Sequence, residues 1–470
     1  MWLRIRQKEK LPLIFVRKEN NCVKIASMER TLVSETPQRV GKEVLLKGWV
    51  NTRRDHGKII FIDLRDRTGL VQVVFVGIEE AGQLRSEWVV EITGLIKKRP
   101  ENLINPKIST GEIEIEAKSL KVLAKAEELP FDTGAENLNV SLPVLLDYRS
   151  LSLRHPKNRA VFKVQETVIS SFREVLTKLG FTEIQVPTIV PSITEGGAQV
   201  FKIKYFENEA FLGQSPQLYK QIMVGVFERV FTLAHAYRAE PSVTTRHMTE
   251  YLGLDAEMGF IEDFDEIMDT VEILLREIFK TIAEKCPKEL EMFSAVLPKL
   301  SDKIPRLKMR EAQQIIFERT GRDNRKEPDL EPEDEREICR YVLEKFGSEL
   351  VFITHYPTKK RPFYTYPDPK DPDYTCSFDL LGRGLEWITG GQRISDYQML
   401  VDNVKKWGNK PEDFDIYLQA FKYGMPPEGG FCLGAERITM QILGLENIRQ
   451  ASLFPRDMER IDLKLPKPEK

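Results

Sequence analysis

Apolar and polar residues alternate in short runs over the first part of the chain, from about residue 43 to 125. Gly and Asp separate five such runs, which read VLLKGWV, IIFIDLRD, LVQVVFV, EWVVEITGLIKK and GEIEIEAKSLKVLA. A period of two places alternate side chains on opposite faces of a strand, so the pattern predicts five half-buried strands. Five short strands in so small a region indicate a small closed β-barrel.

The barrel pattern defines a first domain at 28–130. We expect an OB-fold there, because this is the commonest small barrel that binds single-stranded nucleic acid. Turn-forming residues without a clear period follow, and they predict a linker or hinge over 131–155. Residues 1–27 contain the apolar stretch LPLIFV, which is too short for a signal peptide, and no small-residue cleavage site follows it. We expect 1–27 to be a flexible extension.

The hydrophobic period then changes to that of a helix. From Asn158 to Leu179 apolar residues recur at i, i+3, i+4 and i+7, and Gly180 is placed to end this helix. A strand, FTEIQVPTIV, follows and is interrupted by Pro187.

Helical patterns dominate again at 263–284 and 308–346, and strand patterns return between 352 and 449. The charged stretch DNRKEPDLEPEDERE lies inside the second helical region and is expected to be a solvated loop. Strands and helices occur without regular βαβ alternation. The second domain, at 156–470, is therefore expected to be α+β, with a largely antiparallel sheet flanked by helices.

Composition narrows the classes of protein that fit. The 470 residues carry a net charge of −2, which argues against wholesale electrostatic coating of nucleic acid but permits a local basic patch. Five scattered cysteines without a CxxC pair argue against a disulfide framework or a zinc site. No apolar run reaches the roughly 18 residues of a membrane span. We expect a cytoplasmic protein that does not enter membranes.

The stretch from Arg238 to Glu257, RAEPSVTTRHMTEYLGLDAE, concentrates both signs of charge in two strand-like segments around a polar turn. Packing gains nothing from so many charges, whereas a site that holds phosphates beside a zwitterion needs cations, carboxylates and an aromatic ring. The alternative is an ordinary charged surface hairpin.

Three further clusters lie in the second domain: TEGGAQVF (194–201), GQSPQLYKQ (213–221), and the pair LEWITGGQRISD (385–396) and GMPPEGGFCLGAER (424–437). Each alone is weak. A Gly-rich loop is more often a tight turn than a ligand cradle, Lys220 could be a solvated helix lysine, and Arg437 could belong to a surface ion pair. Their combination indicates a ligand site.

Together these residues resemble the class II aminoacyl-tRNA synthetases. The helix and strand that end in Pro187, the RAE and RHMTE segments that begin at Arg238, and GAER at 434–437 match the three signature motifs. QSPQLYKQ and GGQRISDY narrow the resemblance to aspartyl-tRNA synthetases, over roughly residues 29–460. The short segment between the second and third motifs is similar to archaeal-type enzymes, which lack the large bacterial insertion.

The resemblance implies a role for each matching residue of an ATP site that also uses Mg²⁺. Arg238 would be the catalytic residue, on the α-phosphate. Glu240 would contact the adenine amino group, and Arg246 with His247 would hold the γ-phosphate. Tyr251 and Arg437 would enclose the adenine ring. Glu386, with Thr389 one helical step further on, would hold Mg²⁺.

The resemblance also implies an aspartate site. Lys220 and Arg393 would grip the side-chain carboxylate, for which the planar fork of arginine is suited. Gln217 and Asp255, with Glu195 from a mobile loop, would recognise the α-ammonium group.

For the barrel, the resemblance implies an anticodon site with Phe61 stacked on the middle base and with Arg54 and Gln72 as polar readers. Without the resemblance, Phe61 would be taken for a core residue. His56 is associated with enzymes that accept both the aspartate and asparagine anticodons; the alternative is a solvated loop histidine.

The expected activity is therefore ATP-dependent ligation of L-aspartate to tRNA(Asp), extended to tRNA(Asn) by His56, in a homodimer that forms around Pro187. Three alternatives stay open: an asparaginyl-tRNA synthetase, a non-catalytic RNA-binding paralogue, and an asparagine synthetase built on the same catalytic fold.

Overall fold

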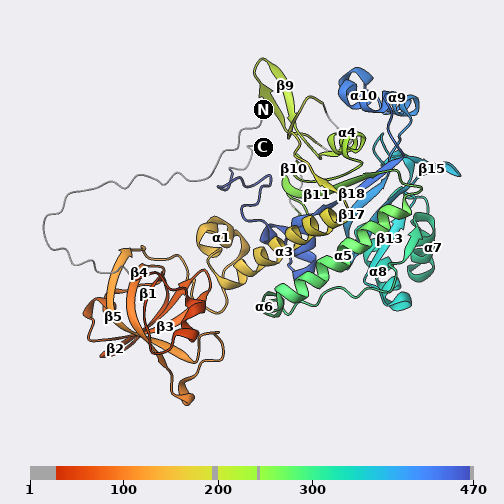
Figure 1. Ribbon diagram of the computed structural model, residues 1–470. Helices are drawn as coiled ribbons and strands as arrows, with labels where there is room; N and C mark the ends of the chain where they lie inside the picture. Colours follow the sequence, from red (N-terminus) through yellow and green to blue (C-terminus); the bar gives the residue numbers. More distant parts are fainter. Residues whose placement is uncertain (1–27, 193–198, 241–243, 466–470) are drawn as a thin grey trace, which may run out of the picture. The chain divides into compact units, whose positions relative to one another are not determined.

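The computed structural model describes residues 28–192, 199–240, 244–465 and divides them into two compact units, with the boundary between Leu138 and Asn139 (Figure 1). Two short helices, α1 (Leu142–Asp147) and α2 (Arg149–Ser152), lie within the stretch for which a linker is predicted. The bounds predicted for the hinge stay a prediction.

The first unit is a closed five-stranded barrel of order β1-β2-β3-β5-β4, which confirms the predicted architecture. Its elements are η1 (Val33–Arg39), β1 (Glu43–His56), β2 (Ile59–Asp66), β3 (Gly69–Val76), η2 (Glu79–Gln83), β4 (Val89–Lys98), η3 (Glu101–Leu103) and β5 (Ile113–Ala124). Alternate residues of the strands, such as Leu46, Ile62 and Val73, fill the barrel core. The period of two in the sequence therefore corresponds to the inside and outside of the barrel.

The second unit is built on an eight-stranded sheet of order β12-β13-β16-β17-β18-β11-β10-β6. The two outermost pairs, β12 with β13 and β10 with β6, are parallel and the others are antiparallel. The strands are β6 (Thr182–Glu183), β10 (Arg229–Tyr237), β11 (Glu250–Gly259), β12 (Arg306–Lys308), β13 (Leu350–Thr354), β16 (Ser377–Gly382), β17 (Leu385–Gln392) and β18 (Glu428–Gly434). The prediction of a largely antiparallel α+β domain is confirmed.

Helices cover the sheet, and smaller sheets lie beside it (Figure 1). The helices are α3 (Pro156–Lys178), α4 (Gln217–Phe227), α5 (Asp265–Lys285), α6 (Pro287–Met292), α7 (Met309–Thr320), α8 (Pro332–Phe346), α9 (Tyr397–Lys406), α10 (Asp415–Lys422) and α11 (Ala435–Leu443), with the 3-10 turns η4 (Thr358–Lys360), η5 (Pro411–Phe414) and η6 (Ile448–Ala451). The small sheets contain β7 (Ile189–Val190), β8 (Lys202–Tyr205) and β9 (Asn208–Leu212), and β14 (Pro367–Asp368) with β15 (Asp371–Thr375). No helix of the described residues is long and apolar enough to cross a membrane.

The predicted strand around Pro187 divides into two short strands, β6 and β7. Strand β6 pairs with β10 of the main sheet, whereas β7 pairs with β9 of a small sheet. Proline cannot donate a hydrogen bond to a neighbouring strand, which accounts for a break at this position.

The predicted loop DNRKEPDLEPEDERE is partly wrong, because α8 begins inside it at Pro332. Pro332 occupies the first turn, and the Asp334 carboxylate accepts from the backbone N–H of Glu331 over 3.0 Å. Acidic residues in the first turn also favour the helix dipole, so this charged sequence is a helix start.

Candidate active site

The main sheet separates an apolar face from a polar one. Residues of β10, β11, β17 and β18, among them Phe231, Leu254 and Phe431, pack with α3, α5 and α11 into one core. Their alternate neighbours, such as Asp255 and Cys432, line a cavity on the opposite face. The strand period of two thus places the chemistry on one side of the sheet.

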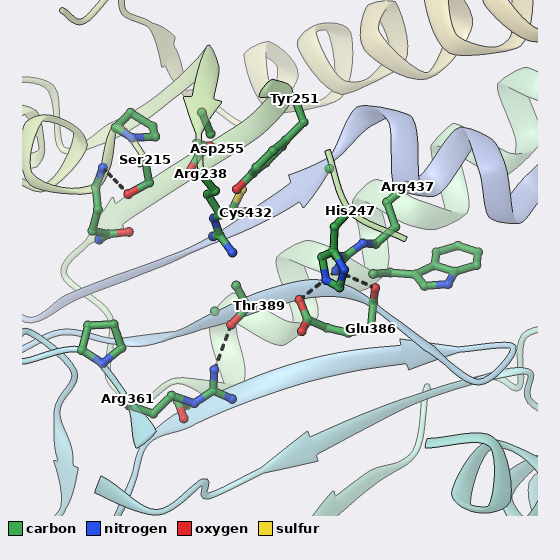
Figure 2. Close-up of a pocket in the computed structure, with 18 of the residues that line it drawn as sticks. Ser215, Arg238, His247, Tyr251, Asp255, Arg361, Glu386, Thr389, Cys432 and Arg437 are labelled. Atoms are coloured by element: carbon green, nitrogen blue, oxygen red, sulfur yellow. Dashed lines mark hydrogen bonds and ion pairs between the residues drawn. The ribbon is translucent and has the colours of Figure 1, made fainter. Parts of the chain in front are cut away.

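The cavity has a volume of about 350 Å³ and gathers segments that lie far apart in the sequence (Figure 2). Every predicted ATP, aspartate and metal residue within the described part of the chain lines it: Gln217, Lys220, Arg238, Glu240, Arg246, His247, Tyr251, Asp255, Glu386, Thr389, Arg393 and Arg437. Glu195, predicted for the α-ammonium group, lies outside the described residues.

Lys220 lies at the buried end of the cavity and is 1 % exposed. Its ammonium contacts Asp255 Oδ1 at 2.9 Å, Glu257 Oε2 at 3.1 Å and the Phe431 carbonyl at 3.3 Å. Burial alone would lower the pKa of Lys220, but Asp255 and Glu257 outweigh it, so the pKa lies above its usual value. With three acceptors already in contact, Lys220 supplies a fixed positive charge.

Arg393 is the second buried cation, and it follows β17. Its Nε donates to Glu257 Oε1 over 2.7 Å and its Nη2 to the Gly430 carbonyl over 3.0 Å, while no described residue accepts from Nη1. Burial opposes its charge, but Glu257 outweighs burial and raises the pKa of Arg393. Arg393 can therefore donate to a bound carboxylate without giving up Glu257.

Asp255 faces the same end of the cavity with one oxygen committed. Oδ1 accepts from Lys220, whereas Oδ2 is buried and has no hydrogen-bond partner among the described residues. Gln217 lies one helical turn before Lys220 on α4, so both side chains reach the sheet from the same helix face. A buried carboxylate oxygen without a partner suits an ammonium group.

At the other end of the cavity, a cation lies over an aromatic ring. The Arg238 guanidinium lies 5.5 Å from the centre of the Tyr251 ring, and both are labelled in Figure 2. Arg246 approaches Glu335 with 3.7 Å between Nη1 and Oε2. Burial, followed by the nearby Arg437, lowers the pKa of His247. A phosphate group would complement this positive potential.

Glu386 and Thr389 lie on strand β17, so the expected helical step between them is wrong. Residues three apart on a regular strand point to opposite faces, yet both line the cavity. On the neighbouring strand β16, Leu381 pairs with Glu386 and Leu380 pairs with Ile388. This β-bulge adds one residue to β17, so Glu386 and Thr389 point to the same face.

The same area holds residues that the sequence interpretation missed. Arg361 Nη2 lies 2.8 Å from Asp379 Oδ2, and Arg361 Nη1 donates to Thr389 over 3.1 Å. Arg437 donates to Glu386 Oε1 over 3.3 Å. Asp379 is the one acid in the buried run SFDLL of β16, and a lone acid in a buried strand is a signal that could have identified it.

On the barrel, the four predicted anticodon residues lie on three adjacent strands. Phe61 of β2 pairs with Arg54 of β1, and the side chain of Arg54 donates to Gln72 of β3 over 3.2 Å. The His56 and Phe61 rings meet edge to face, with 5.6 Å between their centres. Phe61 is half-buried and lies outside the barrel core, so its interpretation as a core residue is wrong.

Comparison with known proteins gives both units a family. Residues 141–458 match the model of tRNA synthetases class II (D, K and N), and residues 44–123 match the OB-fold nucleic acid binding domain. A cavity on one face of a largely antiparallel sheet, together with a barrel of this type, is the architecture of a class II tRNA synthetase. The chain belongs to this family, in the group denoted D, K and N, which confirms the resemblance drawn from the sequence.

Individual relatives cover nearly the whole chain. It is 43% identical over 440 residues to the Aspartate–tRNA(Asp/Asn) ligase of Deinococcus radiodurans, covering 92% of this chain and 99% of that protein. It is 40% identical over 438 residues to the Aspartate–tRNA(Asp) ligase of Pyrococcus abyssi, covering 91% and 97%. Asparaginyl-tRNA synthetase from Pyrococcus horikoshii, solved with asparaginyl-adenylate, has 34% identity and a TM-score of 0.84, with 92% and 99% covered.

Proposed function

We propose that this chain is an aspartate–tRNA ligase that activates L-aspartate with ATP, forming AMP, and transfers the amino acid to the 3′ end of tRNA. The observation that carries the proposal is the pair of buried cations, Lys220 and Arg393, beside the uncompensated oxygen of Asp255. The names of the Deinococcus and Pyrococcus abyssi relatives support the same substrate.

The charges at the buried end favour aspartate over asparagine. The ligand's ammonium group would neutralise Asp255, and its side-chain carboxylate would accept from Arg393 Nη1 within reach of the Lys220 charge. An amide in place of that carboxylate would leave positive charge uncompensated in a buried site, which is costly.

At the phosphate end, the α-carboxylate of aspartate would attack the α-phosphorus of ATP, and the bond to pyrophosphate would break. Arg238 would stabilise the charge that develops on the α-phosphate, and Arg246 with His247 would bind the leaving group. The reaction needs no side-chain nucleophile, because orientation and fixed charges supply the catalysis. A terminal ribose hydroxyl of tRNA then attacks the aspartyl carbonyl, and AMP leaves.

The residues present fit a Mg²⁺ ion that arrives with ATP. The buried Oδ1 of Asp379 has no hydrogen-bond partner among the described residues, and Glu386 lies on the adjacent strand. No cluster of three or more His, Cys, Asp or Glu side chains suited to a metal occurs within the described ranges, so phosphate oxygens would complete the coordination. Glu386 and Thr389 would hold the ion, which would neutralise phosphate charge.

The barrel would bind the anticodon through Phe61, Arg54 and Gln72, and His56 would extend the range to tRNA(Asn). The name of the Deinococcus relative includes both tRNAs, whereas that of the Pyrococcus abyssi relative includes one. A homodimer formed around Pro187 and a cytoplasmic location remain part of the proposal.

Parallel charging of purified tRNA(Asp) and tRNA(Asn) transcripts with labelled aspartate tests this function. We expect label on both transcripts. Label on tRNA(Asp) alone would remove the dual range, and labelled asparagine on tRNA(Asn) without aspartate transfer would replace the activity by that of an asparaginyl enzyme.

A further inference from the structure

Two glutamates, Glu257 and Glu428, are buried behind the amino-acid end of the cavity, and both are 0 % exposed. Glu257 pairs with Gly430 across strands β11 and β18, and Glu428 lies two residues before Gly430. The two side chains therefore point to the same face of the sheet as diagonal neighbours. Neither glutamate lines the cavity, so each acts on a ligand through other residues.

The surroundings of Glu257 suit an ionised carboxylate. Arg393 donates to Oε1 over 2.7 Å, and Lys220 lies 3.1 Å from Oε2. Gln217 Nε2 also approaches Oε2, at 3.5 Å. Two cations and an amide compensate the charge of this buried group.

Glu428 has a different set of partners. Gln221 Nε2 donates to Oε1 over 2.8 Å, whereas the buried Oε2 has no partner in the described part of the chain. The Tyr417 hydroxyl donates to Gln221 Oε1 over 3.2 Å, which fixes the amide so that its NH₂ group faces Glu428. A buried carboxylate with one neutral donor would be poorly compensated, so these contacts favour the neutral acid.

The protonation of Glu428 decides the charge available to a substrate. With Glu428 neutral, the two cations exceed Glu257 by one positive charge, and the ligand's ammonium group neutralises Asp255. That surplus matches one side-chain carboxylate. With Glu428 ionised the surplus disappears, and a buried carboxylate ligand is no longer compensated.

We propose that Glu428 is a specificity-determining positioning residue, which remains a neutral acid and thereby keeps the aspartate side-chain site positively charged. The inference rests on the proposed aspartate activity. The groups that face Glu428 are Glu257 from β11, Lys220 and Gln221 from α4, Tyr417 from α10, and Arg393 after β17.

Electrostatics around Glu428 agree with this geometry. Burial, with a further contribution from Glu257, raises the pKa of Glu428 well above its usual range. Burial likewise raises the pKa of Tyr417 and of Cys432, and the pKa of Lys220 lies above its usual value. A pH high enough to ionise Glu428 should therefore weaken the binding of aspartate.

The test is the KM for aspartate in ATP–pyrophosphate exchange, measured from neutral pH to about pH 9 for the wild type and Glu428→Gln, since Gln mimics the neutral acid. We expect the wild-type KM to rise about tenfold for each pH unit above the pKa of Glu428. We expect Glu428→Gln to follow only the titration of the substrate's ammonium group, with kcat at neutral pH within a factor of about two of wild type. Glu272→Gln, a buried acid of α5 away from the cavity, should keep the wild-type profile.

A KM for aspartate at neutral pH more than about tenfold lower in Glu428→Gln than in the wild type would show that Glu428 is charged there, and would overturn the inference while leaving aspartate activation intact. A wild type without aspartate-dependent exchange at neutral pH would instead reject the proposed function. If Glu428→Gln does not fold, calorimetric titration of the wild type with aspartate in two buffers of different ionisation enthalpy decides. At a pH where the wild-type KM has risen, proton uptake greater than that of the substrate's own ammonium group supports the inference, and uptake no greater than that overturns it.

Discussion

Arg393 and Glu257 form a buried ion pair in which Nε lies 2.7 Å from Oε1. The pair orients the guanidinium so that Nη2 reaches the Gly430 carbonyl and no described residue accepts from Nη1. Glu257 therefore orients the cation that we propose for the substrate side chain, and the two residues form one unit.

Arg393→Lys tests this orientation. Lysine keeps the charge but loses the planar fork, so it cannot contact Glu257 and a substrate carboxylate in the same geometry. We expect kcat/KM for aspartate in pyrophosphate exchange to fall about 100-fold, which corresponds to about 2.7 kcal/mol. Arg173→Lys on α3, whose ion pair with Glu183 is exposed, should change it less than twofold. A fall below threefold in Arg393→Lys would contradict the role of the fork.

Gly430→Ala tests the close packing around Glu257. An added Cβ would lie 2.1 Å from Glu257 Oε2 and 2.1 Å from the Ala256 carbonyl, so the strand or the carboxylate must move. We expect a loss of about 2 kcal/mol in the free energy of unfolding, measured in urea, together with loss of exchange activity. Gly225→Ala on α4, where a Cβ would first meet the flexible Met425 side chain at 3.4 Å, should be neutral or stabilising. Equal stability of both variants would refute the packing argument.

Phe61→Ala separates the two units by function. Loss of one stacked base should reduce kcat/KM for tRNA charging roughly 5- to 150-fold, which corresponds to about 1–3 kcal/mol of stacking free energy. Pyrophosphate exchange without tRNA should stay at the wild-type rate, because the cavity lies in the other unit. Val76→Ala on β3, an exposed residue of the same barrel, provides the control. Unchanged charging by Phe61→Ala would remove Phe61 from the anticodon site.

Glu436→Gln tests a half-buried acid at the start of α11. Burial raises the pKa of Glu436 to about 7, above the value of an unfolded glutamate. Because the folded state binds this proton more tightly than the unfolded chain does, protonated Glu436 stabilises the fold at pH values below the pKa of an unfolded glutamate. This contribution is lost as the pH rises toward 7. We expect the unfolding free energy of the wild type to fall by up to about 3 kcal/mol between about pH 4.5 and 7, relative to Glu436→Gln. Parallel stability curves of the wild type and the variant would contradict this origin.

The sequence predicted the barrel and the α+β sheet because both depend on a local period of apolar residues. Leu46, Ile62 and Val73 alternate with outward residues, and this period survives folding unchanged. The start of α8 was harder to predict, because a capping interaction such as that of Asp334 with the Glu331 backbone overrides a charged composition.

Site residues that lie in short sequence motifs were predictable. Their side-chain directions and mutual contacts were less predictable, because pairing between strands determines them. The common face of Glu386 and Thr389 depends on a β-bulge that no residue pattern indicated. The pairing of Glu257 with Arg393 joins residues 136 positions apart, so only the sheet register brings them together. Arg361 was missed because it follows the short turn η4, outside the motifs, and Asp379 was missed although a lone acid in a buried strand could have identified it.

ATP–pyrophosphate exchange with the purified chain, measured in parallel with L-aspartate and L-asparagine, tests the central claim most directly. Because an amide would leave buried cations uncompensated, we predict a kcat/KM for aspartate at least about 10³-fold above that for asparagine. Equal or greater efficiency with asparagine, or no exchange with either amino acid, would contradict the assignment of Lys220 and Arg393 to an aspartate site.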